Sequence, residues 1–378
     1  MTASPSMLKV LSVFGTRPEA IKMAPVVAEL GRQGARVINR NCFTGQHRDM
    51  VQPLIRLFGL RVDYDLKLMK ESQTLEYLTN RVLSEVGAIL REEKFDYVLV
   101  QGDTTTSMAA ALAAYYAGTR VGHVEAGLRT YDKSQPYPEE VNRRIIDAVG
   151  DLFFAHTGHA RDNLLREGVD AARIEVTGNT VIDALLDVAG RAYRFDDPQL
   201  QVLARDPRRM VLVTAHRRES FGAPFESLCA GLKQLAQRHS DVLVVYPVHL
   251  NPNVRKVVGA TLRGLDNVVL LEPLDYEPFV HLMKKAYLLL TDSGGVQEEG
   301  PSLDKPVLVM RNVTERLEGV AAGTIRLVGT DARTIVTEAS RLLEDRQAYQ
   351  EMASRKNPYG DGTAAVRTVR RLLQEAPA

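Results

Sequence analysis

The chain has 378 residues, of which 45% are hydrophobic and 25% charged, proportions that are typical of a globular protein with room for two domains. Its 48 Lys and Arg residues nearly balance its 47 Asp and Glu residues, so no overall basic field points to a nucleic-acid partner. Aromatic residues make up 6% and Trp is absent, which disfavours stacking platforms for single-stranded nucleic acid.

The cysteines and the N-terminus indicate the compartment. Cys42 and Cys229 lie far apart, stand among apolar residues and show no metal-ligand spacing. We therefore expect free buried thiols, which fit a reducing compartment. The first 15 residues contain Lys9 and no apolar run long enough for a signal peptide or a membrane span. These features predict a cytoplasmic protein that does not insert into membranes.

Apolar runs alternate along the chain with helical segments. Continuous runs such as 98–100 and 242–245 are typical of parallel strands that are buried on both faces, and helices are predicted between strands, for example at 107–117 and 225–238. The alternation predicts an α/β chain. Strands are expected at 8–14, 36–43, 96–102, 120–125, 151–155, 173–177, 210–215, 241–247, 267–271, 287–291, 306–310 and 325–328.

A polar segment at 190–209, with two prolines, separates two sets of strands and marks a domain boundary. We predict an α/β fold with two Rossmann-like domains facing a cleft. The N-terminal domain is expected over 1–185 and the C-terminal domain over 186–360. Apolar residues recur on one face of a helix predicted near the C-terminus, so we expect the segment 361–378 to pack back on the N-terminal domain.

Ligands of open parallel sheets bind beyond the carboxyl ends of the strands, so polar residues after the predicted strands are site candidates. The first strand leads into GTRPE, in which Pro18 suits the first helical position. Arg17 then stands at a helix start and Lys22 about one turn later, where both cations can meet a diphosphate. This turn has a single glycine and no dinucleotide fingerprint, which gives nicotinamide binding little support.

Three carboxylates form a candidate acid–base set. Asp103 and Glu125 each stand at the end of a predicted strand, and Glu139 lies in a later loop close to Arg143. Carboxyl groups that converge in a partly dry cleft push their pKa values apart, so that one can take a proton and another can give one. For Asp103, a helix N-cap is the structural alternative.

Cations and histidines follow strands in the second half of the chain. His216 ends one strand, where it can bridge phosphate oxygens or steer a proton, and Arg217 adds charge beside it. His249 stands in the same kind of position, and Arg316 follows a later strand and can reach a nucleotide. A lone histidine is more often structural, so the prediction for His216 depends on its strand-end position and flanking cations.

The segment TDSGGVQEEG at 291–300 follows a short apolar run and predicts an anion site. Ser293 can cap the first helical turn, and Gly294 and Gly295 let backbone N–H groups approach a phosphate without an intervening Cβ. Two glutamates follow one turn later, where a carboxylate can accept hydrogen bonds from ribose hydroxyls. An ordinary strand-to-helix turn has the same pattern, so the interpretation as a nucleotide-sugar site depends on the residues described above.

A series of motifs, in order over roughly residues 8–373, carries a family resemblance. They are FGTRPEAIKMAP at 14–25, TGQHRDM at 44–50, QGDTTT at 101–106, HVEAGLRT at 123–130, PYPEEVNR at 136–143, VTGNTVID at 176–183, TAHRRESFG at 214–222, DSGGVQEEGPSL at 292–303 and MRNVTERLEG from 310. With these motifs the chain resembles the bacterial non-hydrolysing UDP-N-acetylglucosamine 2-epimerases.

The resemblance implies a glycosyltransferase-B-like fold, a homodimer and no cofactor or metal. It also implies reversible interconversion of UDP-GlcNAc and UDP-ManNAc through UDP and a bound 2-acetamidoglucal. The implied catalytic residues are Asp103, Glu125, Glu139 and His216. The implied substrate-binding residues are Arg17, Lys22, Arg143, Ser293, Gly294, Gly295, Glu299 and Arg316.

Some members of this family bind a second UDP-GlcNAc as an activator. The positions that resemble its contacts are Gln46, Gln73, Glu139, Arg217 and His249. The chain departs from this pattern in an expected helix at 67–73, where Ser72 stands at a position that is often basic. It also has ERLEG at 315–319 in place of a more usual Arg-Pro-Glu-Ala, next to the nucleotide.

Four alternatives remain open from the sequence. An epimerase of another UDP-acetamido sugar, such as a diacetamido-uronic acid, would need a further basic contact for the sugar carboxylate. A hydrolysing variant would release UDP and free ManNAc. A glycosyltransferase of the same fold would need an acceptor, and a non-catalytic UDP-sugar sensor would have no use for three carboxylates beside an anionic ligand.

Overall fold

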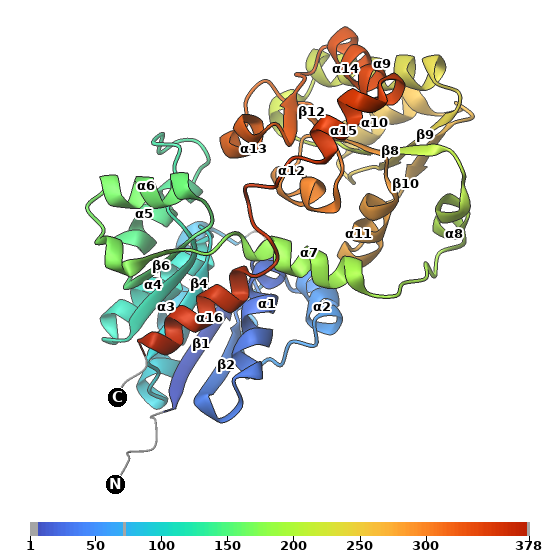
Figure 1. Ribbon diagram of the computed structural model, residues 1–378. Coiled ribbons are helices and arrows are strands. Elements are labelled where there is room, and N and C mark those ends of the chain that lie inside the picture. The colour runs from blue at the N-terminus through green and yellow to red at the C-terminus, as the bar shows by residue number, and fades with distance from the viewer. Residues whose placement is uncertain (1–6, 71–72, 376–378) are drawn as a thin grey trace. The chain divides into compact units, whose positions relative to one another are not determined.

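The computed structural model describes residues 7–70 and 73–375, and the chain divides into two compact units. Unit 1 comprises residues 1–184 and 359–378, and unit 2 comprises residues 185–358. Each unit is built on one parallel sheet, with helices on both sides of it (Figure 1). The boundary between the units falls within helix α7 (Thr180–Gly190).

The sheet of unit 1 has seven strands in the order β3-β2-β1-β4-β5-β6-β7. The strands are β1 (Leu8–Phe14), β2 (Val37–Phe43), β3 (Tyr64–Asp65), β4 (Tyr97–Gln101), β5 (Arg120–Ala126), β6 (Leu152–Ala155) and β7 (Ile174–Val176). The helices are α1 (Arg17–Arg32), α2 (Arg48–Leu57), α3 (Leu75–Glu92), α4 (Thr105–Tyr116), α5 (Glu139–Val149), α6 (Gly158–Arg166) and α16 (Ala364–Gln374), with short 3₁₀ turns η1 (Gly34–Arg36) and η2 (Ala171–Arg173).

Alternate residues of the central strands enter two separate cores. Val98 and Val100 of β4 pack in a cluster with α3, α4 and α5, whereas Tyr97 and Leu99 pack in a cluster with α1 and α16. Burial on both faces explains the continuous apolar run of this strand. The C-terminal helix α16 lies beside α1, although the two are separated by most of the chain (Figure 1).

The sheet of unit 2 has six strands in the order β10-β9-β8-β11-β12-β13. The strands are β8 (Arg209–Thr214), β9 (Val242–Pro247), β10 (Val268–Leu271), β11 (Leu288–Thr291), β12 (Val307–Val309) and β13 (Ile325–Leu327). The helices are α8 (Pro198–Arg205), α9 (Ala223–Arg238), α10 (Pro252–Leu262), α11 (Tyr276–Lys285), α12 (Gly294–Glu299), α13 (Leu317–Ala322), α14 (Ala332–Glu344) and α15 (Arg346–Ala353), with 3₁₀ turns η3 (Arg218–Ser220) and η4 (Gly300–Leu303).

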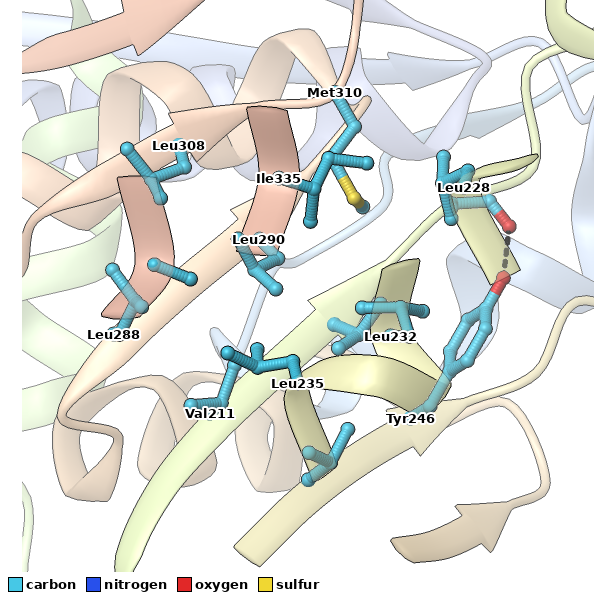
Figure 2. Packing of buried hydrophobic residues seen from close by; sticks show 14 of the residues in the cluster. Val211, Leu228, Leu232, Leu235, Tyr246, Leu288, Leu290, Leu308, Met310 and Ile335 are labelled. Atoms are coloured by element: carbon cyan, nitrogen blue, oxygen red, sulfur yellow. Dashed lines mark hydrogen bonds between the residues drawn. The ribbon is translucent and has the colours of Figure 1, made fainter. Parts of the chain in front are cut away.

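The core of unit 2 fills the space between its sheet and α9 and α14. Figure 2 shows leucines of α9 facing Val211 of β8 and Tyr246 of β9, with Leu290 of β11 beside them. Each such side chain, when fully buried, contributes about 1.5–3 kcal/mol to folding. The Tyr246 hydroxyl donates to the carbonyl of Ala215 at 2.5 Å, so the core also fixes the backbone immediately after β8.

Each of the predicted strands is confirmed to within one residue at either end. The sequence did not predict β3, because two residues without an apolar run leave no pattern. It also gave no sign of α8, which lies inside the polar segment 190–209. Within the described ranges, no helix is both long and apolar enough to cross a membrane.

The helix expected at 67–73 is wrong for the part of it that the structure describes. Residues 67–70 and 73 are not helical. Lys67 has a left-handed backbone with φ of 52°, and the N–H of Leu68 donates to the carbonyl of Thr44 at 2.9 Å, which ties this stretch to the loop after β2. Ser72 lies outside the described residues.

Candidate active site

The candidate residues stand at the topological switch point of each sheet. In unit 1 the strand order reverses between β1 and β4, and in unit 2 it reverses between β8 and β11. The loops at the carboxyl ends of the two strands diverge at such a point, which leaves the crevice where open α/β sheets bind their ligands. The segments that start at Gly15, Gly102, Ala215 and Asp292 follow these four strands.

A buried carboxylate, Glu19, joins the two switch-point loops of unit 1. One of its oxygens accepts the backbone N–H groups of Gly15 at 3.0 Å and Thr16 at 2.6 Å. The other accepts the hydroxyls of Thr104 at 2.6 Å and Ser107 at 2.7 Å, at the start of α4. Because these donors come from both loops, Glu19 sets the geometry of the turns that follow β1 and β4.

Arg17 and Lys22, the two cations expected to meet a diphosphate, differ in their surroundings. Arg17 begins α1 and is exposed, and Pro18 is the second helical residue rather than the first. The Lys22 side chain is only 14% exposed, and its Nζ lies 2.5 Å from Oε1 of Glu125. The structure therefore places Lys22 against a carboxylate and leaves Arg17 at the solvent-facing start of the helix.

Glu125 has the most unusual backbone of the predicted site residues. Its φ of 66° lies in the left-handed region, where the pairing of β5 with β6 shifts register. Its carboxylate accepts hydrogen bonds from Lys22, Gln101 and Asn179, the last at 2.8 Å. Residues held in such a conformation cost about 1–3 kcal/mol and cluster at functional sites, where the distortion re-aims the side chain.

Asp103 is held by α5. Its carboxylate accepts two hydrogen bonds from the guanidinium of Arg143, whose side chain is only 4% exposed, and its carbonyl accepts the side-chain amide of Asn142 at 2.9 Å. The N-cap of α4 is Thr104, which accepts the N–H of Ser107. The structural alternative for Asp103, a helix cap, is therefore wrong.

Glu139 begins α5 and is half-buried. The next residue, Glu140, is fully buried, accepts the backbone N–H groups of Thr130 and Tyr131, and lies 3.2 Å from Arg143. Arg143, which lies close to Glu139 in the sequence, bridges Asp103 and Glu140 in the structure. This arrangement fixes the first turn of α5 against the loop after β4.

Gln46 and Gln73, the unit 1 residues expected to bind an activator, contact each other. The side-chain amide of Gln73 lies 3.4 Å from the carbonyl of Gln46, and the Gln46 side chain accepts the hydroxyl of Thr106 at 2.8 Å. Thr106 belongs to α4, so this pair borders the same switch-point loops.

In unit 2 a second buried carboxylate, Asp292, joins the switch-point loops. Its Oδ2 accepts the backbone N–H groups of His216 at 2.5 Å and Arg217 at 2.7 Å. Its Oδ1 lies 3.6 Å from Nδ1 of His216, whose side chain is 40% exposed. His216 is thus oriented both through its backbone and by a carboxylate that faces its ring.

His249 lies against His216. The two rings are stacked, with centroids 4.9 Å apart and planes inclined by 6°. Nδ1 of His249 accepts the backbone N–H of Asn251 at 3.1 Å, which fixes the orientation of the ring. The strand-end positions predicted for both histidines bring them together.

Two guanidinium groups surround the start of α12. A Cβ added at Gly294 would lie 3.4 Å from Nη2 of Arg316 and 3.8 Å from Nη2 of Arg217, so these cations face the backbone where Gly294 and Gly295 begin the helix. Ser293 occupies the N-cap position, but its side chain makes no capping hydrogen bond, and that part of the expectation is wrong. The positive charge in this part of unit 2 comes from arginines as well as from the backbone.

The two glutamates of α12 have different roles. Glu298 is buried and pairs with Arg316 at 2.6 Å, so its carboxylate orients that guanidinium. Glu299 accepts the hydroxyl of Tyr276 at 2.9 Å and lies near Gly295 on the same side of the helix. Burial and the adjacent Glu299 raise the pKa of Tyr276, so that its hydroxyl stays protonated and donates.

The prediction from sequence missed Glu19, Gln101, Asn179 and Asp292 as parts of the site. Only Glu19 has a local signal, since Thr16-x-x-Glu19 is a capping-box pattern before an apolar helix. The others act through partners that are distant in the sequence. Within residues 7–70 and 73–375, no three His, Cys, Asp or Glu side chains are placed to hold a metal ion.

The two halves offer complementary chemistry. The switch point of unit 1 carries carboxylates fixed by hydrogen bonds and cations, the groups that move protons in general acid–base catalysis. The switch point of unit 2 carries a histidine, two arginines and a glycine-rich helix start, which are suited to a phosphorylated ligand.

Comparison with known proteins identifies relatives over nearly the whole chain. Residues 30–373 match the family model described as UDP-N-acetylglucosamine 2-epimerase. A probable UDP-N-acetylglucosamine 2-epimerase of Ralstonia nicotianae is 54% identical over 371 residues, covering 97% of this chain and 99% of the relative. The UDP-N-acetylglucosamine 2-epimerase of Escherichia coli K12 is 52% identical over 373 residues, covering 97% and 98%.

A solved structure agrees with these relatives. The crystal structure of the UDP-GlcNAc 2-epimerase from Neisseria meningitidis bound to UDP-GlcNAc is similar to this chain with a TM-score of 0.88 and 44% identity, covering 97% of this chain and 100% of that one. The likeness includes both sheets, and the predicted glycosyltransferase-B-like class of two Rossmann-like domains is confirmed.

Proposed function

The chain belongs to the UDP-N-acetylglucosamine 2-epimerase family, and we propose that it interconverts UDP-GlcNAc and UDP-ManNAc without net hydrolysis. A carboxylate removes the proton from carbon 2 of the sugar while the bond between carbon 1 and the UDP oxygen breaks. UDP leaves with the electron pair, and a 2-acetamidoglucal with a carbon 1–carbon 2 double bond remains. A proton is then delivered to the opposite face of carbon 2, and the UDP oxygen adds back to carbon 1.

The observation that carries this proposal is the arrangement of Glu125. A left-handed backbone, a register shift and three polar partners hold one carboxylate in place at the carboxyl end of β5. Asp103 follows the neighbouring strand, and a Cβ at Gly102 would lie 3.5 Å from Oε2 of Glu125, so the two carboxylate-bearing segments are adjacent. Removing a weakly acidic carbon-bound proton requires such a positioned base, and returning it to the other face requires a second group.

Asp103, Glu125 and Glu139 are therefore proposed as the acid–base residues of unit 1. Arg143 orients Asp103 through two hydrogen bonds. Lys22 pairs with Glu125, and together with the exposed Arg17 it is proposed to meet the charge of the departing diphosphate.

Unit 2 is proposed to bind UDP. Negative charge develops on the diphosphate as it leaves, and His216, Arg316 and the backbone of Ser293–Gly295 are proposed to stabilise it, which their mutual proximity at the start of α12 and after β8 supports. Glu299, oriented by Tyr276, is proposed to accept the ribose hydroxyls. His216 is proposed as a catalytic residue because the charge that it stabilises on UDP develops as the bond to carbon 1 breaks.

Further properties expected from the family resemblance are proposed with this function. They are a homodimer in the cytoplasm, no cofactor, and a second UDP-GlcNAc bound as an activator by Gln46, Gln73, Arg217 and His249. The contact between Gln46 and Gln73 and the stacking of His249 on His216 support two preformed parts of such a site.

The deciding experiment is proton NMR of UDP-GlcNAc with the purified protein in deuterium oxide. We expect UDP-ManNAc to appear, with deuterium at carbon 2 of both sugars and no accumulation of free UDP. Free UDP with free ManNAc would instead establish a hydrolysing enzyme. No change in the spectrum would refute the proposal, and other UDP-acetamido sugars would then be tested in the same way.

His216→Ala tests the role assigned to unit 2. We expect weaker UDP binding in calorimetry and a slower release of UDP in a single turnover, because the side chain meets the charge that develops as the bond breaks and that free UDP also carries. The matched control is His239→Ala, a histidine whose Nε2 contacts Ser340 at 2.8 Å in the core of unit 2. If both measurements match wild type for His216→Ala, His216 does not belong to the site.

A further inference from the structure

A fully buried histidine, His123, lies close to the segments that carry Asp103 and Glu125, two of the three proposed acid–base carboxylates of unit 1. It belongs to β5, two residues before Glu125, and its side chain has no exposed surface. Nδ1 lies 2.6 Å from Oδ1 of Asp147 on α5, and Nε2 lies 2.7 Å from the carbonyl oxygen of Gly102. Both ring nitrogens are therefore within hydrogen-bond distance of an oxygen.

These two contacts determine how many protons the ring holds. The carbonyl of Gly102 can only accept, so Nε2 must carry a proton. An ionised Asp147 can also only accept, so Nδ1 must carry a proton as well. A neutral ring would place a nitrogen lone pair against an oxygen lone pair in a dry interior, which the short distances do not allow.

An imidazolium at His123 balances the charges of the side chains that it joins. Oδ2 of Asp147 lies 2.7 Å from Nη2 of Arg129, but Arg129 also forms two hydrogen bonds with Glu167. Burial raises the pKa of Asp147, but the attraction of His123 and Arg129 outweighs it and the pKa is lowered overall. Asp147 is thus a carboxylate, and a protonated His123 brings this group of four side chains to neutrality.

On the flanking strands the ring has uncharged neighbours, and the nearby cations Arg143 and Lys22 are paired with Asp103 and Glu125. On the flanking strands His123 pairs with Val100 of β4 and Phe153 of β6, both of which are apolar. The remaining carboxylates nearby are those of Glu125, on the same strand, and Asp103, which follows Gly102. The imidazolium therefore places positive charge close to the proposed acid–base pair.

The contact with Gly102 fixes the turn that presents Asp103. Gly102 has φ of 67°, its N–H donates to Val124 at 2.9 Å, and its carbonyl receives Nε2 of His123. The carbonyl of Asp103 itself receives Asn142. The three contacts with Val124, His123 and Asn142 hold the turn at different points, so the position of the Asp103 backbone is set before a substrate binds.

We propose that His123 is an imidazolium at neutral pH and a positioning residue for the reaction, holding the Gly102–Asp103 turn through Nε2 and favouring the ionised forms of Asp103 and Glu125. The catalytic part of this inference rests on the proposed function. The ionisation part concerns the folded protein alone.

The first test is ¹⁵N NMR of protein labelled at histidine, without substrate. An imidazolium has two protonated ring nitrogens with similar shifts, whereas a neutral ring shows one protonated and one unprotonated nitrogen. We expect the imidazolium pattern for His123 at neutral pH, with the signals assigned by their loss in His123→Gln. If that variant does not fold, the displacement of the same signals in Asp147→Asn assigns them. An unprotonated nitrogen in the His123 ring at neutral pH would overturn the inference.

The second test is the pH profile of kcat for His123→Gln, with His239→Gln as the control. A glutamine can still donate to the Gly102 carbonyl but carries no charge, so the general base becomes easier to protonate. We expect kcat to fall on the order of 10- to 100-fold, as for a displaced catalytic group, and the acid limb of the profile to move to higher pH. A lower kcat with an unmoved acid limb would show a structural role only and would overturn the positioning proposal.

The two proposals fail in distinguishable ways. Absence of deuterium at carbon 2 in the wild-type protein would refute the proposed function, whatever the state of the ring. A neutral His123 ring in a protein that epimerises normally would refute only the present inference.

Discussion

Replacement of Glu19 tests whether one buried carboxylate holds the switch-point loops of unit 1 together. In Glu19→Ala the backbone N–H groups of Gly15 and Thr16 lose the acceptor shown by the structure. The hydroxyls lose less, because Ser107 also lies 2.7 Å from the carbonyl of Gln101 and can donate there. The main loss is therefore that of two buried backbone hydrogen bonds.

The size of the effect follows from those two groups. Each buried N–H left without an acceptor costs about 1–3 kcal/mol, so we expect Glu19→Ala to lower the free energy of unfolding by about 4 kcal/mol. In Glu19→Gln the amide oxygen can face the two N–H groups while its NH₂ faces two hydroxyls, which can accept as well as donate. Only the extra strength that the carboxylate charge gives to these hydrogen bonds is lost. We therefore expect Glu19→Gln to lower the free energy of unfolding by about 1–2 kcal/mol.

The assay is thermal unfolding followed by far-ultraviolet circular dichroism. For a unit of this size each kcal/mol lowers the midpoint by about 2–4 °C, so the alanine variant should unfold about 8–16 °C below wild type and the glutamine variant about 2–8 °C below. The matched control is Glu29→Ala on the same helix, since its partners are the side chains of Arg32, which is 69% exposed, and Gln33, and their loss is expected to cost about 1 kcal/mol. Equal midpoints for the two Glu19 variants, or an equally large loss in the control, would refute the reasoning.

Three further predictions concern the site and the core. Asp103→Asn should reduce turnover by about 100-fold or more with little change in the Kd for UDP, and turnover at the wild-type rate would remove it from the acid–base set. Gly294→Ala should weaken UDP binding, since the added Cβ meets two guanidinium groups, whereas Gly259→Ala, which would meet one side-chain atom at 3.8 Å, should not; equal Kd values by calorimetry would contradict this. Burial raises the pKa of Cys229 to about 12 and also raises that of Cys42, so a thiol reagent should label neither in the native protein and both in urea; labelling of native protein would show that they are accessible.

The strands could be predicted from sequence because parallel strands buried on both faces appear as continuous apolar runs. Once the strands are known, the strand-end rule locates polar residues without further information. Asp103, Glu125 and His216 were found in this way, and each stands at the carboxyl end of a strand in the structure. The pattern of apolar residues along the chain was therefore sufficient to locate these three residues at strand ends.

The partners of these residues could not be predicted, because they depend on the order of the strands in space. Arg143 is 40 positions from Asp103, and Asn179 is 54 positions from Glu125. Lys22 was expected at a diphosphate and contacts Glu125, 103 positions away. No local pattern specifies a contact over such separations, and polar side chains are compatible with many partners.

The same physical solution occurs at both switch points, and it explains why a carboxylate is needed there. Where the neighbouring loops diverge, the backbone N–H groups of Gly15 and Thr16 after β1, and of His216 and Arg217 after β8, lie beyond the strand pairing and need another acceptor. Glu19 accepts two N–H groups of its own loop with one oxygen and two hydroxyls of the loop after β4 with the other. Asp292 accepts two N–H groups of the loop after β8 with one oxygen and faces the ring of His216 with the other. A neutral amide would satisfy the same donors more weakly. The loops that carry Arg17 and His216 are therefore each held in place by a buried carboxylate, which fixes the backbone from which these two side chains are proposed to meet the diphosphate.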